Sequence, residues 1–218
     1  MFIFPSFQGH DIGRNLLKRT LTSWKNVQIT NRATMTFAFN PVSQFLYMNY
    51  GMYPREPAYY VEAPSGRITE KTMESPNGLD FEELKSLRDG TPILRKMDEI
   101  VVGFSLDWHH EYFFETKARC YIVKDKGNPV GYVYLSPEGR VGPMAVKSSE
   151  FTGGVLDKAL GLAASQGVEK VRYWMPGSNI QAVKLALMYK MQLDPALFMC
   201  TKPFAKWENY IFSSAALM

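Results

Sequence analysis

Cysteine is scarce in this 218-residue chain, and long apolar runs are missing. Cys120 and Cys200 are its two cysteines, and they lack the spacing of a zinc site, so we expect neither a disulfide framework nor a zinc finger. Both thiols should be reduced and buried. The longest strongly apolar stretches, such as residues 132–135 and 196–200, are far shorter than the roughly 20 residues that span a bilayer. We therefore expect no membrane-spanning helix.

The first residues also lack the marks of a targeting sequence. Residues 1–5 carry no basic group and are soon followed by polar residues, which argues against a signal or transit peptide and favours a cytoplasmic location. The formal net charge is only +4, and charges of both signs alternate along the chain. Such mild basicity suits a small anionic ligand better than a nucleic acid, so we expect neither nucleic acid nor membrane as a partner.

The composition is that of a globular protein, with 46% hydrophobic and 21% charged residues. The periodic apolar pattern stops between residues 63 and 80, where proline, glycine and serine accumulate. We therefore predict an N-terminal part over residues 1–63, a linker over residues 64–78 and a C-terminal part over residues 79–218.

The N-terminal part has the pattern of helix, strand, helix and strand. Residues 12–25 place their apolar side chains near one face of a helix, and residues 27–39 are rich in β-branched and aromatic side chains. Asn40 can cap a second helix, with Pro41 in its first turn and Gly51 as a left-handed stop.

In the C-terminal part, apolar residues between Phe81 and Ile100 suggest one or two helices, after which the pattern changes to the period of two typical of strands. Pro143 interrupts one strand, so it must lie at an edge, at a bulge or where the ladder opens. The predicted strands are residues 120–123 and 130–135, which form a hairpin, and residues 141–146, 168–175, 197–201 and 207–212; the predicted helices are residues 155–164 and one capped by Asn179.

The order helix, strand, helix, strand thus occurs over residues 12–61 and again over residues 155–201. Asn40 and Asn179 cap the second helix at comparable offsets, which indicates a degenerate internal repeat. We predict a mixed α/β fold with a central mixed sheet flanked by helices.

Residues 2–14 run from a short apolar strand through a glycine-containing turn into the start of a helix. Such a junction directs unpaired backbone N–H groups and the positive end of the helix dipole at one point, where a phosphate fits. Gly9 and Gly13 allow close approach, and Arg14, Lys18 and Arg19 add positive charge. The spacing matches neither GxGxxG nor a P-loop, so nicotinamide and ATP are poor candidates.

These residues resemble a known family. The run Gln8-Gly9-His10-Asp11-Ile12-Gly13 resembles the Q/R-x-x-G-x-G/A pyrophosphate loop of the GNAT acyl-CoA N-acyltransferases, with Asp11 in place of the usual middle glycine. Residues 40–52 are similar to the family's next motif, an Asn, a small residue three positions later, then Leu-Tyr and Gly-Phe. Residues 130–212 resemble a second GNAT domain, so the chain is identified as a tandem GNAT protein.

The resemblance implies direct transfer of an acetyl or other acyl group from acetyl-CoA to a primary amine, without a metal. Asn40 would contact the pantetheine or support the loop, and Tyr47 matches the general acid that protonates the departing thiolate. Glu56 and Glu62 follow the second helix, but neither is singled out as a general base. The residues expected to hold the pyrophosphate are Gln8, Gly9, His10, Asp11, Ile12, Gly13 and Arg14.

The chain departs from the family pattern in two places. Several family strands and helices precede the pyrophosphate loop, whereas here the loop lies within the opening residues, so the first domain lacks its front half. In the second copy Glu150 takes the place of Gln8 and Ala186 the place of Tyr47, which suits a scaffold or an acceptor-side partner. A sheet edge exposed by the missing front half would favour a homodimer.

Other interpretations stay open. Tyr47 can be a packing tyrosine, and Asn40 caps a helix whether or not it binds a ligand. Residues 107–111 bring carboxylate and imidazole groups together, but without further ligands at matching spacing we prefer a polar helix end or turn to a metal site. The rival to an enzyme is a catalytically inactive GNAT-fold module that binds CoA, another ligand or a protein. Nucleic-acid binding ranks last.

Overall fold

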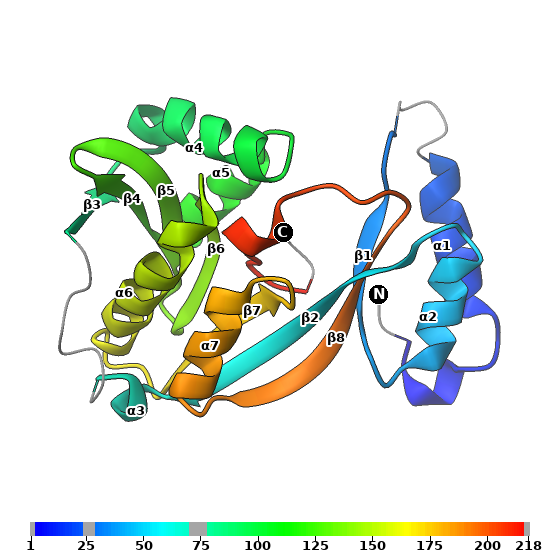
Figure 1. The fold of residues 1–218 in the computed structure, drawn as a ribbon. Coiled ribbons are helices and arrows are strands. Elements are labelled where there is room, and N and C mark those ends of the chain that lie inside the picture. Colours follow the sequence, from blue (N-terminus) through cyan, green and yellow to red (C-terminus); the bar gives the residue numbers. More distant parts are fainter. Residues whose placement is uncertain (1–2, 24–28, 70–77, 216–218) are drawn as a thin grey trace.

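The computed structural model describes residues 3–23, 29–69 and 78–215. In this part of the chain, nine strands form one mixed sheet (Figure 1), which confirms the predicted fold class. The strands are β1 (Ala33–Phe37), β2 (Tyr53–Pro64), β3 (Leu79–Leu84), β4 (Arg119–Asp125), β5 (Asn128–Leu135), β6 (Arg140–Val146), β7 (Lys170–Pro176), β8 (Gln192–Cys200) and β9 (Tyr210–Ile211). Their order in the sheet is β1-β8-β2-β7-β6-β5-β4-β3, with β9 beside β6.

The first predicted repeat has the expected order of elements, but its first strand, β1, covers only residues 33–37 of the predicted range 27–39, of which residues 27 and 28 lie outside the described residues. A short 3-10 turn (Pro5–Phe7) precedes α1 (Ile12–Ser23), and α2 (Pro41–Met48) follows β1. The side-chain oxygen of Asn40 accepts a hydrogen bond from the Ser43 N–H at 3.1 Å, and Gly51 has a φ of 79°, which confirms both the cap and the left-handed stop. The predicted positions 24 and 25 of α1 lie outside the described residues.

The predicted order of elements is also confirmed over residues 155–201, as α6 (Thr152–Ala164), β7, α7 (Ile180–Met188) and β8. The side-chain oxygen of Asn179 accepts from the Ala182 N–H at 3.0 Å. The start of the C-terminal part differs from the prediction, because residues 79–84 form strand β3 and the helices α4 (Leu87–Val101) and α5 (Asp107–Glu115) follow it. A hydrogen-bonded partner, β4, overrides the helix-like spacing of Phe81 and Leu84.

The two repeats interleave their strands. Strand β8 from the second repeat lies between β1 and β2, and β2 from the first repeat lies between β8 and β7. All three pairings are antiparallel. If β1 and β2 of the first repeat are exchanged with β7 and β8 of the second, the order β1-β8-β2-β7 is the same, read in the opposite direction. The predicted N-terminal part thus contributes β2 to the middle of the sheet.

The predicted linker begins with regular structure. Helix α3 (Ser65–Thr69) follows β2 directly, and Ile68 is fully buried in the main core. The Ser65 N–H donates to the Glu169 carbonyl at 3.0 Å, which fixes the start of α3 against the chain before β7. Residues 70–77 of the predicted linker lie outside the described residues.

Strands β6 and β7 separate soon after they meet. They pair in parallel at two positions, Arg140 with Arg172 and Val141 with Tyr173. Beyond this point β9 pairs with β6, and the Phe212 N–H donates to the Trp174 carbonyl of β7 at 3.0 Å. The ladder thus opens next to Pro143, which is one of the three positions that the sequence left open for this proline, and residues 207–213 fill the opening.

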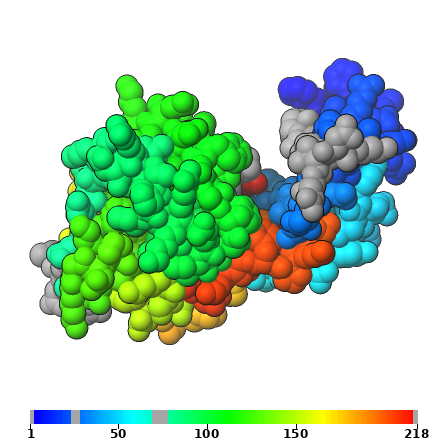
Figure 2. Space-filling model, turned by 90° about the horizontal axis from the view of Figure 1, so that it is seen from above, coloured from blue at the N-terminus to red at the C-terminus, as the bar shows by residue number. Residues whose placement is uncertain are grey.

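Two layers of helices enclose most of the sheet. Helices α6 and α7 cover one face around a large apolar cluster, and α4 and α5 cover the other face together with residues 204–212. Residues 3–52, here called the N-terminal lobe, lie at the β1 end, and Figure 2 shows them set apart from the C-terminal lobe, residues 79–191, by a hollow. No helix among the described residues is long and apolar enough to cross a membrane.

Candidate cofactor site

The predicted pyrophosphate loop lies at the N-terminus of α1. Gly9 has a φ of 81° and Asp11 a φ of 55°, so the chain turns sharply before the helix begins at Ile12. The Asp11 carbonyl accepts the first helical hydrogen bond, from the Asn15 N–H at 2.9 Å. The N–H groups of Ile12, Gly13 and Arg14 therefore belong to the first turn, where a helix offers donors to an anion.

Local hydrogen bonds shape the loop and leave space above it. The Gln8 side-chain amide donates to the Ile3 carbonyl at 3.0 Å, and His10 Nδ1–H donates to the Gln8 carbonyl at 3.0 Å. A Cβ atom placed on Gly9 would meet no atom within 4 Å. Gln8, Gly9 and His10 are exposed, so the loop is open to a ligand from solvent.

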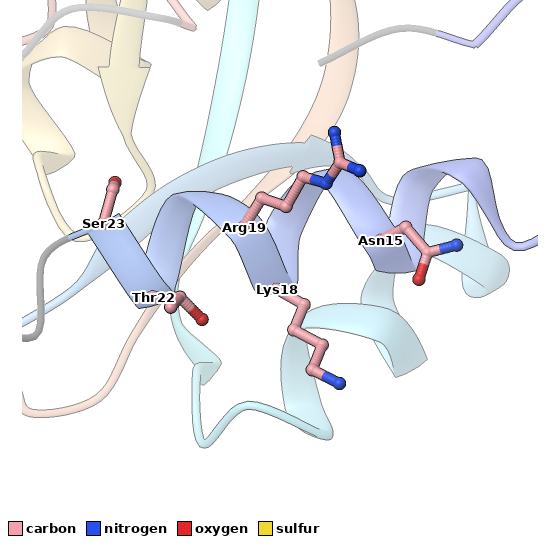
Figure 3. Close-up of a pocket in the computed structure, with 5 residues that line it drawn as sticks. All are labelled: Asn15, Lys18, Arg19, Thr22 and Ser23. Carbon is pink, nitrogen blue, oxygen red and sulfur yellow. The ribbon is translucent and has the colours of Figure 1, made fainter.

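Charge at this helix terminus is mixed. The Asp11 carboxylate opposes an incoming phosphate, but Arg14 pairs with it at 3.2 Å, and both side chains are largely exposed. Positive charge continues along the helix with Lys18 and Arg19. These two residues line a hollow of about 670 Å³ together with Asn15, Thr22 and Ser23, and Figure 3 shows that all five side chains come from α1.

Asn40 lies at the same end of the N-terminal lobe as the loop. Figure 1 shows that α1 and α2 begin at this end, the lower one in that view. Tyr47, two turns further along α2, is only 8% exposed and packs in a small cluster with Met52, Met199 and Leu17. Helices α1 and α2 therefore begin at one end of the N-terminal lobe, and Tyr47 lies deeper, packed against residues of α1 and β8.

Neither carboxylate after α2 is free to act as a base. Glu56 is buried and accepts a hydrogen bond from the Ser178 N–H at 2.7 Å. Glu62 accepts from Lys170 Nζ at 2.6 Å and from the Tyr60 hydroxyl at 2.8 Å. The hydrogen bond from Lys170 has the larger effect, and together with that from Tyr60 it lowers the pKa of Glu62 below its ordinary value. Both carboxylates thus hold neighbouring elements together.

The corresponding place in the second repeat has different chemistry. A crevice of about 270 Å³ lies at the start of α7 and beside the turn before α6, and it contains two carboxylates, Glu150 and Glu208. The side-chain amide of Asn179 donates to the Tyr210 carbonyl at 3.0 Å, so the cap residue is also tied to β9. Ala186 is buried. The role of the second copy as a scaffold or an acceptor-side partner stays a prediction.

The residues 107–111 that suggested a metal site serve other purposes. Asp107 pairs with Arg95 at 2.7 Å, and the hydrogen bonds from Arg95 and then Ser105 lower its pKa to about 2. Burial and the charge of the neighbouring His110 lower the pKa of His109 to about 4. No group of three or more histidine, cysteine, aspartate or glutamate residues in the described part of the chain could hold a metal ion.

Sequence reasoning missed a buried polar network in the C-terminal lobe. Asp98 is fully buried and accepts hydrogen bonds from His110 Nε2 at 2.9 Å, the Tyr132 hydroxyl at 2.7 Å and the Leu106 N–H at 3.0 Å. His110 Nδ1 lies 3.0 Å from the Tyr134 hydroxyl. A carboxylate at the Asp98 position, within the apolar stripe of α4, was the available sign of such a network.

The network also contacts Cys120 through Tyr134, so it contains the three kinds of side chain of a catalytic triad, a nucleophile, a histidine and a carboxylate. Burial raises the pKa of Cys120 to about 12, and the side chain is only 1% exposed. The thiol is therefore neutral and closed to substrates, and the network joins α4 and α5 to β5.

Comparison of the sequence with models of protein families and with curated proteins finds no match. Solved structures, in contrast, are similar over most of the chain. A protein of Pyrococcus horikoshii described as a candidate acetyltransferase is 16% identical with a TM-score of 0.68, covering 98% of this chain and 66% of its own. A GCN5-related N-acetyltransferase from Sphaerobacter thermophilus is 15% identical with a TM-score of 0.64, covering 93% and 72%.

A third similar structure, a GCN5-related N-acetyltransferase from Anabaena variabilis, is 16% identical with a TM-score of 0.56. It covers 91% of this chain and 52% of its own. The chain thus spans about half to three quarters of the length of these proteins. At such low identities the likeness concerns the fold: this chain has the fold of the GCN5-related N-acetyltransferases, the GNAT fold that the sequence motifs suggested.

Proposed function

We propose that this protein is a tandem GNAT-type N-acyltransferase that transfers an acetyl or other acyl group from acetyl-CoA directly to a primary amine. The observation that carries the proposal is the open turn at residues 8–14. It contains the first-turn N–H groups of α1, has empty space above Gly9 and lies at the end of the lobe where α2 also begins. The shared fold supports the same conclusion, because the similar structures include N-acetyltransferases.

The residues present fit the pyrophosphate of coenzyme A. Backbone N–H groups of Ile12, Gly13 and Arg14 would bind its oxygens, with Gln8, Gly9 and His10 shaping the loop and Asp11 held by Arg14. Lys18 and Arg19 extend the positive charge along α1. Bound acetyl-CoA would supply the thioester that donates the acyl group.

Tyr47 is the proposed proton donor. A phenol with a pKa near 10 can protonate a departing thiolate, whose thiol has a pKa near 8.5, as negative charge develops. The hydroxyl group of Tyr47 would then act at the inner end of the site, where burial excludes water. We expect a cytoplasmic protein that acts on a primary amine and that can form a homodimer.

Turnover tests the catalytic part of this proposal. Release of free thiol from acetyl-CoA should depend on an amine from a screened panel, and Tyr47→Phe should lower kcat while leaving the affinity for acetyl-CoA unchanged. Wild-type turnover in Tyr47→Phe would reject the acid role. Tyr50→Phe, on a tyrosine that packs beside the same cluster, is the matched control and should turn over normally.

A second candidate is a GNAT-fold module without catalysis, which binds CoA, another ligand or a protein. The packing of Tyr47 among Met52, Met199 and Leu17 favours this candidate, because a purely structural tyrosine would pack in the same way. Binding of acetyl-CoA without thiol release for any amine would select this module over the enzyme.

A further inference from the structure

Strand β1 forms one end of the sheet and has an unpaired edge. It pairs with β8 through five consecutive residues without a bulge, and no other described strand lies beside it. Its sequence, Ala-Thr-Met-Thr-Phe, contains neither a charge nor a proline. A flat and neutral edge of this kind is a ready template for pairing with another strand.

The opposite end of the sheet is protected. Strand β3 carries Asp80, Glu82 and Glu83 along its six residues. Glu83 pairs with Arg119 at 2.8 Å, and Glu82 pairs with Lys124. Charged side chains on an edge strand oppose pairing with a further strand. The contrast between the two edges indicates that β1 is the end at which this sheet can be extended.

The side chains of β1 alternate between two uniform faces. Thr36 lies on the α2 face, where its hydroxyl is 2.5 Å from that of Ser43, and Thr34 shares that face. Ala33, Met35 and Phe37 lie on the other face, where Met35 packs against the apolar cluster that α4 and α5 cover.

Exposed aromatic surface adjoins the apolar face of β1. Phe37 is 45% exposed and Phe39 is 73% exposed, and their rings stack at 5.1 Å. Contiguous exposed aromatic side chains beside an open strand edge are typical of an interface that a partner covers.

We propose that β1 pairs antiparallel with β1 of a second copy of this chain, about a two-fold axis at Met35. In this register Ala33 faces Phe37 of the second copy, Thr34 faces Thr36, and Met35 faces itself. Every cross-strand pair is apolar with apolar or threonine with threonine, and no two charges meet. A two-fold interface requires a surface that complements itself, which this neutral strand provides and a charged strand would not.

The dimer joins two nine-stranded sheets end to end. It gives hydrogen-bond partners to the N–H and C=O groups on the open edge of β1, except the Phe37 carbonyl, which already accepts from the Asn40 N–H at 3.1 Å and from the Gln44 side chain at 3.3 Å. It also brings Phe37 of each copy against Ala33 of the other. The inference deepens the homodimer part of the proposed function by naming its surface, and it does not depend on acetyl-CoA. Calorimetric titration with acetyl-CoA tests the cofactor site, and sedimentation tests the dimer, so either proposal can fail while the other holds.

Sedimentation equilibrium of the full chain tests the proposal. The wild-type protein should sediment at twice the chain mass of 24.9 kDa. Ala33→Lys combined with Phe37→Lys places a lysine opposite a lysine twice across the axis and should raise the dimer dissociation constant about tenfold or more. Ala33→Lys combined with Phe37→Glu places a lysine opposite a glutamate instead, and should restore the dimer.

Leu193→Lys is the control for an added exposed lysine, because Leu193 is 46% exposed on β8 and faces Val61 of β2. It should leave the dimer intact, and circular dichroism should show all variants folded. A monomeric wild-type chain at about 100 µM, or an unchanged dimer in the double-lysine variant, would overturn the proposal. A monomeric lysine-glutamate variant beside a dimeric wild type would overturn the register.

Discussion

The two repeats contain the same order of helices and strands, yet their first helices bury very different numbers of residues. Helix α1 has no buried residue, whereas α6 buries seven of its thirteen. The difference arises around the repeats rather than within them, because α6 packs on the strands β4–β7 and α1 meets only a small cluster. An amphipathic pattern therefore predicts a helix, but its stability depends on the layer it packs against.

The first prediction compares a buried and an exposed carboxylate. Asp98→Ala should lower the free energy of unfolding by about 3 to 5 kcal/mol, because His110, Tyr132 and the Leu106 N–H lose their common acceptor inside the C-terminal lobe. Asp11→Ala in the N-terminal lobe should change it by about 1 kcal/mol or less, since its ion pair is exposed. Urea denaturation measures both, and equal losses would contradict the contrast.

The second prediction compares two helical leucines. Leu160→Ala in α6 should cost about 2 to 5 kcal/mol of unfolding free energy, because the side chain is fully buried and leaves a cavity. Leu17→Ala in α1, where the side chain is only partly buried, should cost about 1 kcal/mol. The same denaturation experiment gives the difference, and a larger loss at Leu17 would show that the N-terminal lobe is the more tightly packed one.

The third prediction compares the two helix caps. Asn179→Ala should cost about 2 to 4 kcal/mol, because the variant loses the cap of α7 and also leaves the buried Tyr210 carbonyl without its donor. Asn40→Ala removes a cap on an exposed residue and should cost about 1 kcal/mol. Thermal unfolding ranks the two variants, and the reverse order would refute the role given to β9.

The fourth and smallest prediction concerns pH. His109 has a pKa of about 4 in the folded chain and an ordinary value near 6.5 when unfolded. Between these values the unfolded chain binds the extra proton, so stability falls as the pH is lowered from about 6.5 toward 4. His109→Gln should flatten this dependence, whereas His10→Gln, at an exposed position, should not. Unfolding free energies at pH 7 and pH 5 in all three proteins decide the point.

The local part of the fold could be predicted because local chemistry fixes it. Asn40, Asn179 and Gly51 act as caps and stops where the sequence placed them, and Pro143 lies where the ladder opens. Strand β3 was misassigned because Phe81 and Leu84 have helical spacing, and only its pairing with β4 decides its structure. The interleaving of β2 and β8 depends on pairings between distant segments, which local patterns do not contain.

The candidate site was predicted in part for the same reason. Residues 8–14 are consecutive, so a turn and a helix start suffice to bring them together. The packing of Tyr47 against Met199 joins segments about 150 residues apart, and no local sequence pattern predicts such a contact. The roles of these residues stay predictions.

Calorimetric titration with acetyl-CoA of three proteins, the wild type, Gly13→Val and Gly153→Val, tests the central claim most directly. The account predicts micromolar binding, about −8 kcal/mol, to the wild type and to Gly153→Val, whose altered glycine lies in the second repeat beside Gln181. Binding should disappear in Gly13→Val. Equal binding by Gly13→Val, or no binding to a folded wild type, would contradict a cofactor site at the start of α1.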